Sequence, residues 1–281
     1  MRFLTLIAAA LGLYYLEFKW SFPYWDVVLE PYGHALFWAW GNFDGVHYLR
    51  LAQEGYNFGL TQAFFPMYML MIRYISLIIP NMLLVGLGLS HIFFILSLWI
   101  FYKLVRLDYS KTIAKRTLLL YTLFPTSFYF LSLYTESLFM FLLFSIFYLW
   151  RKKQWMAAGL LGILLTATRI VGIFIVPALL LELYLQKKST SQSIAKQINL
   201  KITISHYQVL ITNYIKPQIS NLITHYWKIL AALIPSLGLL TYMLYLYIRF
   251  DDPLLFANVQ SDFGAGRETG KFILLYQVIW R

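Results

Sequence analysis

The segment from Trp40 to Arg50 carries the densest group of polar side chains in the chain. Asp44 lies in a turn-like Asn-Phe-Asp-Gly context, and His47 follows three residues later, on the same face if a helix begins at Asp44. An aspartate is in its basic form at neutral pH and can take a proton from a hydroxyl group. The alternative is that Asp44 only caps a helix that starts at Val46.

The surroundings of His47 do not favour a metal site, because no second histidine or carboxylate follows at metal-ligand spacing. His47 is therefore interpreted as a hydrogen-bonded interface residue. The chain has no cysteine, which excludes thiolate metal sites, cysteine nucleophiles and disulfides. Arg50 and Glu54, four residues apart, are interpreted as a surface pair. No cofactor is expected, and a dependence on a divalent metal is left open.

Two further ionisable residues, Glu136 and Arg169, interrupt apolar sequence. Glu136 begins an apolar run, where an acid also interacts favourably with a helix dipole. Arg169 lies inside the long apolar run from Trp155 to Leu185, where an arginine at mid-membrane costs about 2.5–3.5 kcal/mol. We expect Arg169 to have a function. The alternatives are that its side chain reaches the membrane interface or pairs with Glu136 for structure alone.

A fourth candidate is Arg267, which follows Gly264–Gly266. The Gly-Ala-Gly-Arg sequence lets backbone N–H groups and a guanidinium approach an anion, and an arginine can hold a phosphate. The alternative is a plain flexible turn.

The elements that position these residues are predicted from composition. Of the 281 residues, 60% are hydrophobic and 12% charged, against about 45–50% and about 25% in soluble chains. The mean hydropathy is +0.65. A soluble globule, a disordered tail and a nucleic-acid-binding domain are all poor fits to these values. We therefore expect an all-α polytopic membrane protein that forms a single domain over residues 1–281 and lies in a lipid bilayer. The expected membrane spans are residues 3–16, 82–102, 117–131, 134–150, 156–167, 170–185 and 229–248.

The distribution of charge predicts the orientation of these spans. With the N-terminus inside, the inner side receives 15 of the 23 basic residues, while 10 of the 12 acidic residues fall outside. The net charge of +11 is thus interpreted as membrane orientation and not as affinity for nucleic acid. The outer loops are residues 17–81 and 249–271, and residues 187–228 form an inner loop. The apolar run 63–79, with Arg73 inside it, is expected to lie in the outer interface.

In this topology Asp44, Glu136, Arg169 and Arg267 reach the same membrane face. Carboxylates and arginines at one headgroup layer suit a lipid-phosphate substrate, because an arginine binds the phosphate and a carboxylate takes a hydroxyl proton. The apolar stretch 272–280 stops at Arg281, and we expect a chain shorter than its natural relatives.

Several motifs occur together and in the order of a known family. The sequence from Phe43 to Leu49 resembles the tryptophan-or-phenylalanine, aspartate, x, x, histidine, tyrosine motif of PIG-V-type mannosyltransferases. Further similar segments are Gly55–Tyr56, Ala63–Tyr68, Phe124–Thr126, Tyr134–Phe139, Thr168–Gly172 and Asp252–Phe256 with Gln260. Met69 stands where the family commonly has proline. The resemblance extends over about residues 20 to 281.

The resemblance implies a GT-C-like transmembrane helix bundle with juxtamembrane helices in the first outer loop. It implies transfer of mannose from a polyprenyl- or dolichyl-phosphate donor to a glycan or glycolipid acceptor on the non-cytoplasmic face, with inversion. Asp44 would be the general base, and Arg169 would hold the leaving phosphate. Glu136 and His47 would position the acceptor or the sugar, and Tyr48 belongs to the same substrate-binding motif.

The membrane would be the plasma membrane in a prokaryote and the endoplasmic reticulum in a eukaryote. The alternatives are another GT-C glycosyltransferase with a different sugar or acceptor, a transporter of lipid-linked sugars, and a non-catalytic scaffold subunit. A transporter is expected to contain inverted repeats, and no internal repeat is visible.

Overall fold

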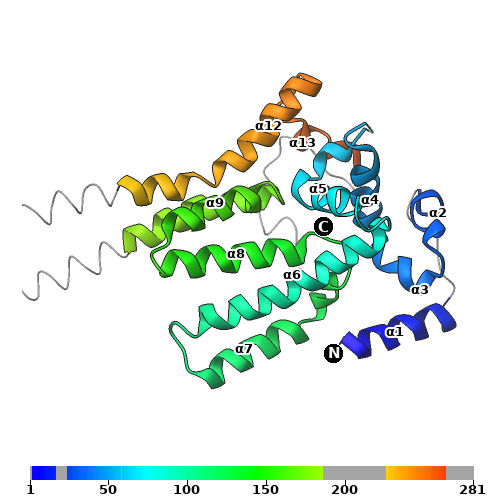
Figure 1. The fold of residues 1–281 in the computed structure, drawn as a ribbon, viewed down its shortest axis with the longest axis horizontal. Helices are drawn as coiled ribbons and strands as arrows, with labels where there is room; N and C mark the ends of the chain where they lie inside the picture. Colours follow the sequence, from blue (N-terminus) through cyan, green and yellow to red (C-terminus); the bar gives the residue numbers. More distant parts are fainter. Residues whose placement is uncertain (1, 17–23, 58, 186–225, 264–281) are drawn as a thin grey trace, which may run out of the picture. The chain divides into compact units, whose positions relative to one another are not determined.

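A computed structural model describes residues 2–16, 24–57, 59–185 and 226–263, and in these ranges the chain forms helices and turns with no strand (Figure 1). The chain divides into two compact units. Unit 1 comprises Met1–Ile95, Leu119–Leu138 and Leu240–Arg281, and unit 2 comprises Leu96–Leu118 and Phe139–Leu239. Each unit is therefore assembled from segments that are distant in sequence.

Unit 1 contains the helices that come before and after the Asp44 motif. They are α1 (Arg2–Tyr15), α2 (Trp25–Val28), α3 (Ala35–Trp38), α4 (Asp44–Glu54), α5 (Pro66–Ile75), the first part of α6 (Met82–Val105) and α13 (Leu255–Asn258). Short 3-10 turns connect them at Glu30–Tyr32, Ala39–Gly41, Thr61–Ala63, Pro125–Phe130 and Ser261–Phe263.

Unit 2 contains the more regular apolar helices. They are the second part of α6, most of α7 (Lys111–Leu123), most of α8 (Glu136–Arg151), α9 (Trp155–Thr166), the 3-10 turn Ile170–Phe174 and the start of α12 (Ser236–Phe250). Helical residues 175–185 follow the turn, and a short helix covers Tyr226–Leu233.

Proline sets two of the helix boundaries that matter for the site. A residue before proline avoids the α conformation. Phe65 is accordingly extended, and α5 begins at Pro66, with the proline at its first helical position. For the same reason α7 ends at Leu123, Phe124 is extended and Pro125 opens a 3-10 turn. The segment expected as one span over 117–131 is thus a helix followed by a tighter turn.

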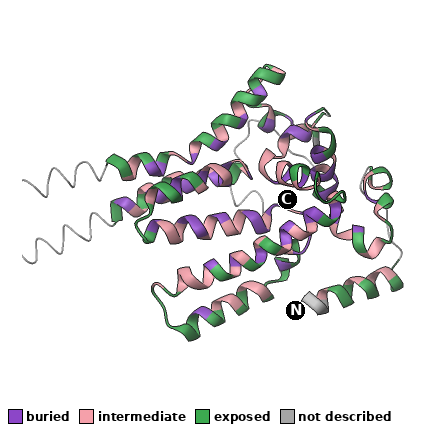
Figure 2. Ribbon diagram, viewed as in Figure 1, coloured by how far each residue is buried: buried purple, intermediate pink, exposed green. Residues whose placement is uncertain are grey.

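Helices α4 and α5 pack against each other in unit 1, and each has a buried face (Figures 1 and 2). Val46, Leu49 and Ile72 are almost completely buried. The carbonyl of Phe64, in the connection between the two helices, accepts hydrogen bonds from Tyr56 Oη at 2.6 Å and Tyr242 Oη at 3.3 Å. These bonds fix the connection between α4 and α5 against the part of α12 that belongs to unit 1.

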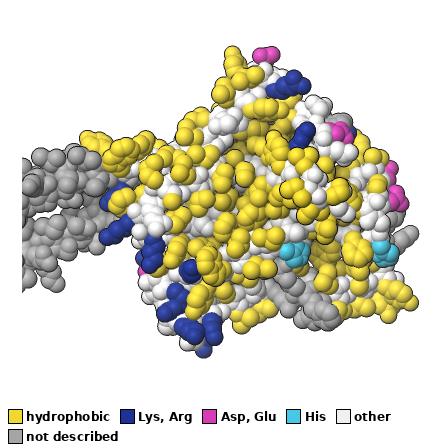
Figure 3. Space-filling model, in the orientation of Figure 1, with side chains coloured by type: hydrophobic (Ala, Val, Ile, Leu, Met, Phe, Trp, Pro, Cys, Tyr) yellow, Lys and Arg dark blue, Asp and Glu magenta, His cyan; other side chains and the backbone are white. Residues whose placement is uncertain are grey.

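Within the described residues, α6 is long and apolar enough to cross a membrane. The helix Tyr226–Leu233 and α12 pass the same test together, with a bend of 41° between them. Shorter apolar helices cover Thr5–Tyr15, Trp155–Thr166 and Ile170–Leu185. Hydrophobic side chains dominate the face of the molecule drawn in Figure 3.

Small residues allow close packing around Pro235, which lies at this bend. A methyl group at Gly162 of α9 would collide with the Pro235 ring, and one at Gly159 would lie 2.5 Å from the Ala231 oxygen. Thr166 Oγ1 donates a hydrogen bond to the Pro235 carbonyl at 2.6 Å. The bend is therefore covered by glycines and bonded by a threonine from α9.

We expect Gly162→Ala to destabilise the protein by about 1–3 kcal/mol, because overpacking forces backbone shifts. The measurement is thermal unfolding in detergent micelles. Gly88→Ala in α6 is the matched control, since nothing lies within 4 Å of a methyl group there. Equal unfolding temperatures for the two variants would contradict the packing described around Pro235.

Candidate functional site

Asp44 follows a tight turn with an unusual backbone conformation. Phe43 has φ 57° and ψ −122°, the conformation of the second residue of a type II′ turn, which normally favours glycine. Gly45 N donates to the Asn42 carbonyl at 3.4 Å, and Phe43 N donates to Asn42 Oδ1 at 2.9 Å. Helix α4 then begins at Asp44, so the carboxylate belongs to the first turn of the helix, near the positive end of its dipole.

The structure does not give Asp44 the capping position that the alternative interpretation requires. Phe43 occupies the N-cap and makes no side-chain capping bond. The helix begins at Asp44, two residues before Val46. Asp44 itself is exposed.

Asp44 and Glu136 line the same cavity of about 370 Å³ in unit 1. Glu136 is the first residue of α8 and is half-buried. The remaining lining is aromatic and comes from Phe43, Phe128, Tyr129 and Tyr134. Phe43 is 53% exposed and Phe128 40%, so both rings are accessible to a bound molecule. The cavity combines two carboxylates with aromatic walls, an arrangement that can accept hydrogen bonds from hydroxyl groups and stack on an apolar ring face.

His47 and Tyr48 lie on the same helix but contribute to packing between α4 and α5. The His47 ring lies 4.7 Å from the Phe64 ring. Burial lowers the pKa of His47 to about 4, with a further contribution from the charge of Arg50, so the imidazole is neutral at physiological pH. Tyr48 is buried and packs edge-on against Phe64 and Tyr68, with centroid distances of 5.3 and 5.4 Å. Neither residue is among those that line the carboxylate cavity.

Arg169 belongs to unit 2 and Arg267 lies outside the described residues. Arg169 is half-buried and extended, at the break between α9 and the turn Ile170–Phe174. The backbone approaches itself closely there, because a methyl group at Gly172 would lie 2.7 Å from the Leu165 oxygen. The structure thus brings together Asp44 and Glu136 among the residues predicted from sequence.

Four aromatic residues of the cavity were not identified as site residues from sequence. Phe43 and Tyr134 belong to the motifs that resemble the family, but the sequence predicted no role for either of them. Phe128 and Tyr129 follow the Phe124–Thr126 motif closely, and this proximity was the available signal. Across the described part of the chain, no group of three histidine, aspartate or glutamate residues could hold a metal ion.

Comparison with known proteins identifies the class. The family model for Mannosyltransferase (PIG-V) matches residues 24–250, which include the Asp44 turn, the carboxylate cavity and Arg169. The chain therefore belongs to the PIG-V mannosyltransferase family, and it is a glycosyltransferase. The resemblance noted from the sequence motifs is confirmed. No curated protein and no solved structure matches the chain significantly.

The lowered pKa of His47 predicts a dependence of stability on pH. Its pKa is about 4 in the folded chain and about 6.5 in an unfolded chain. Between these values the unfolded state binds more protons, so stability falls as the pH is lowered. We expect wild type to lose about 2 kcal/mol more than His47→Gln between pH 7 and 4.5.

The measurement is the unfolding temperature as a function of pH. His34→Gln, which removes an exposed histidine of the same unit, is the control and should keep the wild-type slope. An unchanged slope in His47→Gln would show that His47 is not buried in neutral form.

Proposed function

We propose that this enzyme transfers mannose from a polyprenyl-phosphate-mannose donor to an acceptor hydroxyl on the non-cytoplasmic face of a membrane, with inversion at the anomeric carbon. The observation that carries the proposal is the cavity that Asp44 and Glu136 share in a chain of the PIG-V family. A dolichyl-phosphate donor has the same reacting group. The acceptor is a glycan or a glycolipid.

Asp44 is the general base of the proposed reaction. Its carboxylate takes the proton of the acceptor hydroxyl as the hydroxyl oxygen forms a bond to the anomeric carbon. The bond between this carbon and the phosphate oxygen breaks, and the polyprenyl phosphate leaves with the electron pair. Attack from the face opposite the phosphate inverts the configuration. The position of Asp44 in an accessible cavity supports this role, because the carboxylate can be reached by a hydroxyl group.

Glu136 and the aromatic walls bind the sugar that carries the acceptor hydroxyl or the sugar that is transferred. A second carboxylate accepts hydrogen bonds from the other hydroxyl groups of a pyranose, while Phe43 and Phe128 cover its apolar face. Arg169 and Arg267 neutralise the charge that develops on the leaving phosphate. His47 and Tyr48 position helix α4, and with it Asp44, because their rings pack on Phe64 and Tyr68.

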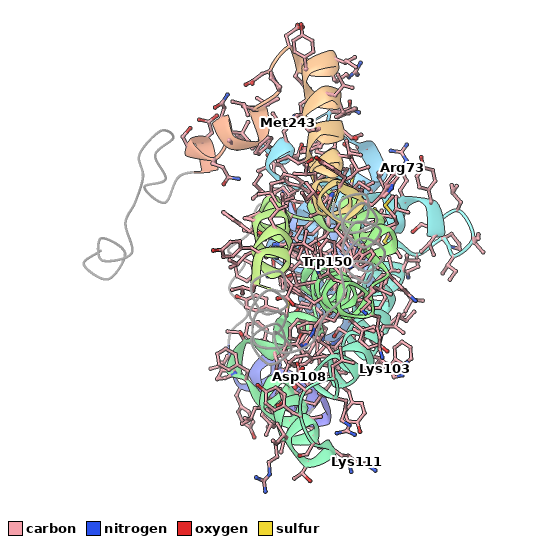
Figure 4. The ribbon with its side chains drawn as sticks, turned by 90° about the vertical axis from the view of Figure 1, so that its left-hand side faces the viewer. Arg73, Lys103, Asp108, Lys111, Trp150 and Met243 are labelled. Carbon is pink, nitrogen blue, oxygen red and sulfur yellow. The ribbon has the colours of Figure 1, made fainter. Side chains whose placement is uncertain are left out.

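The proposed topology is a multi-pass bundle with the spans expected from sequence. Large apolar side chains that are exposed on α6 and α12 support it, because lipid would cover them; they include Leu84, Ile92, Ile95, Leu244 and Ile248. Basic side chains gather at the end of unit 2 where the α6–α7 and α8–α9 connections lie (Figure 3). Figure 4, turned so that this end faces the viewer, labels Lys103, Asp108 and Lys111. Arg151 forms a bidentate ion pair with Asp108 there, with Nη2 2.7 Å from Oδ1. This end would be the cytoplasmic one.

We expect Asp44→Asn to reduce kcat by about 10²–10⁴-fold, because the amide cannot accept the hydroxyl proton. The measurement is transfer of radiolabelled mannose from polyprenyl-phosphate-mannose to endogenous acceptors in membranes. Donor binding should persist, since the substitution preserves the size of the side chain. Asp26→Asn, on α2 and outside the cavity, is the matched control and should retain full turnover.

Full transfer by Asp44→Asn would remove Asp44 from the role of base. Membranes that contain the folded wild type and transfer no mannose from this donor would instead argue for a different sugar donor, or for a transporter or scaffold.

Cysteine labelling tests the topology directly, because the chain has no cysteine of its own. We expect Asp44→Cys to react with a membrane-impermeant maleimide added to intact cells. Lys111→Cys should react only after the membrane is permeabilised. Both positions are exposed to solvent or headgroups in the folded chain. Labelling of both from the same side would contradict the proposed orientation.

A further inference from the structure

A segment of unit 1 that is distant in sequence, Leu133–Tyr134, clamps the turn before Asp44. Leu133 N donates to the Trp40 carbonyl at 2.9 Å, and Tyr134 Oη donates to the Asn42 carbonyl at 3.0 Å. A methyl group on Gly45 would lie 3.3 Å from the Leu133 oxygen, so the two backbones are in close contact on both sides of Asp44.

The clamped turn needs support because of its conformation. Phe43 adopts positive φ at a position of a type II′ turn that glycine usually fills. A residue with a Cβ in this conformation persists only when its surroundings hold it there. The Asn42 carbonyl receives two bonds, one from Gly45 N across the turn at 3.4 Å and the shorter one from Tyr134.

Tyr134 is itself held by a hydrogen bond to its carbonyl and by packing of its ring. Its carbonyl accepts a hydrogen bond from Ser90 Oγ of α6 at 3.3 Å. Ser90 Oγ lies 2.7 Å from the hydroxyl of Tyr68, which is completely buried and also donates to the Gly86 carbonyl at 2.8 Å. The Tyr134 ring packs against Tyr129, with 5.5 Å between centroids. Helices α5 and α6 therefore anchor the residue that holds the turn.

We propose that Tyr134 is a positioning residue whose hydroxyl holds the Asn42 carbonyl and thereby aims the Asp44 carboxylate into the cavity. This inference rests on the proposed function, in which Asp44 is the base. Tyr134 also lines the cavity, and its hydroxyl donates to the Asn42 carbonyl. Its effect on the reaction therefore passes through the turn.

The test is Tyr134→Phe, which keeps the ring and removes the bond to Asn42. We expect kcat to fall by about 10–10²-fold with the KM of both substrates within twofold, because a small misplacement of a reacting group slows catalysis without weakening binding. Tyr121→Phe is the matched control and should leave kcat unchanged. Tyr121 is a half-buried tyrosine of the same unit that packs on Phe94 and Phe130 and does not line the cavity. Unchanged kcat in Tyr134→Phe would overturn the proposal.

A second variant, Phe43→Gly, separates positioning from general loss of structure. Glycine adopts the turn conformation without strain, so the turn depends less on the hydroxyl of Tyr134. We expect Tyr134→Phe to reduce kcat by less than threefold in the Phe43→Gly background. An equal reduction in both backgrounds would show that Tyr134 acts by another route.

Hydrogen exchange tests the clamp without any activity. The amides of Gly45 and Val46, which bond to Asn42 and Phe43, should exchange at least about tenfold faster in Tyr134→Phe and at the wild-type rate in Tyr121→Phe. Unchanged exchange overturns the clamp. If exchange is faster in Tyr134→Phe but Asp44→Asn remains active, the clamp is preserved and Asp44 is not the base. Failure of the clamp and failure of the proposed function are therefore distinguishable.

Discussion

Unit 1 depends on one buried contact. Leu133 packs against α6 and bonds to the turn before α4. Leu133 is completely buried, and its amide bonds to the Trp40 carbonyl. A methyl group at Gly86 would lie 2.7 Å from Leu133 Cδ1, so α6 approaches this side chain closely enough that only glycine fits there without a shift. One leucine therefore joins the turn before α4, the wall of α6 and the start of α8, and the carboxylates of Asp44 and Glu136 meet in a cavity because these three segments meet.

Tyrosine hydroxyls repeat this mode of attachment elsewhere in unit 1. Tyr56 and Tyr242 both bond to the Phe64 carbonyl, Tyr68 bonds to Gly86, and Tyr134 bonds to Asn42. Each bond satisfies a backbone oxygen that lies outside regular helix hydrogen bonding or at a helix–helix contact. In an apolar chain with few charges, a phenol supplies a large buried surface and one directed donor. These four tyrosines thus hold the backbone of unit 1 together through their hydroxyl groups.

Much of this arrangement could be read from residue types. The motif order identified the family, and the prolines at 66 and 125 mark where a helix begins and where one cannot continue. The pairing of Asp44 with Glu136 was expected only as a shared membrane face. The Asn-Phe-Asp-Gly sequence indicates the turn, but the positive φ at position 43 gave no signal, because a phenylalanine and not a glycine stands there. The role of Tyr134 also gave no signal in the sequence. Its hydroxyl bonds to a carbonyl 92 positions away, and such a bond leaves no local pattern.

The bend beside Pro235 has a consequence for which side chains α9 can carry. Proline removes a donor from its helix, and Thr166 of the adjacent α9 bonds to the carbonyl of the same residue. The Pro235 carbonyl also accepts a hydrogen bond from Gly238 N at 3.3 Å, and Thr166 Oγ1 also donates to the Ile163 carbonyl at 3.1 Å within α9. The polar groups at the bend are therefore doubly bonded, and the close approach of α9 is set by its glycines. Any side chain larger than hydrogen at Gly159 or Gly162 has to push α9 away from the bend, and so would lengthen the Thr166–Pro235 bond.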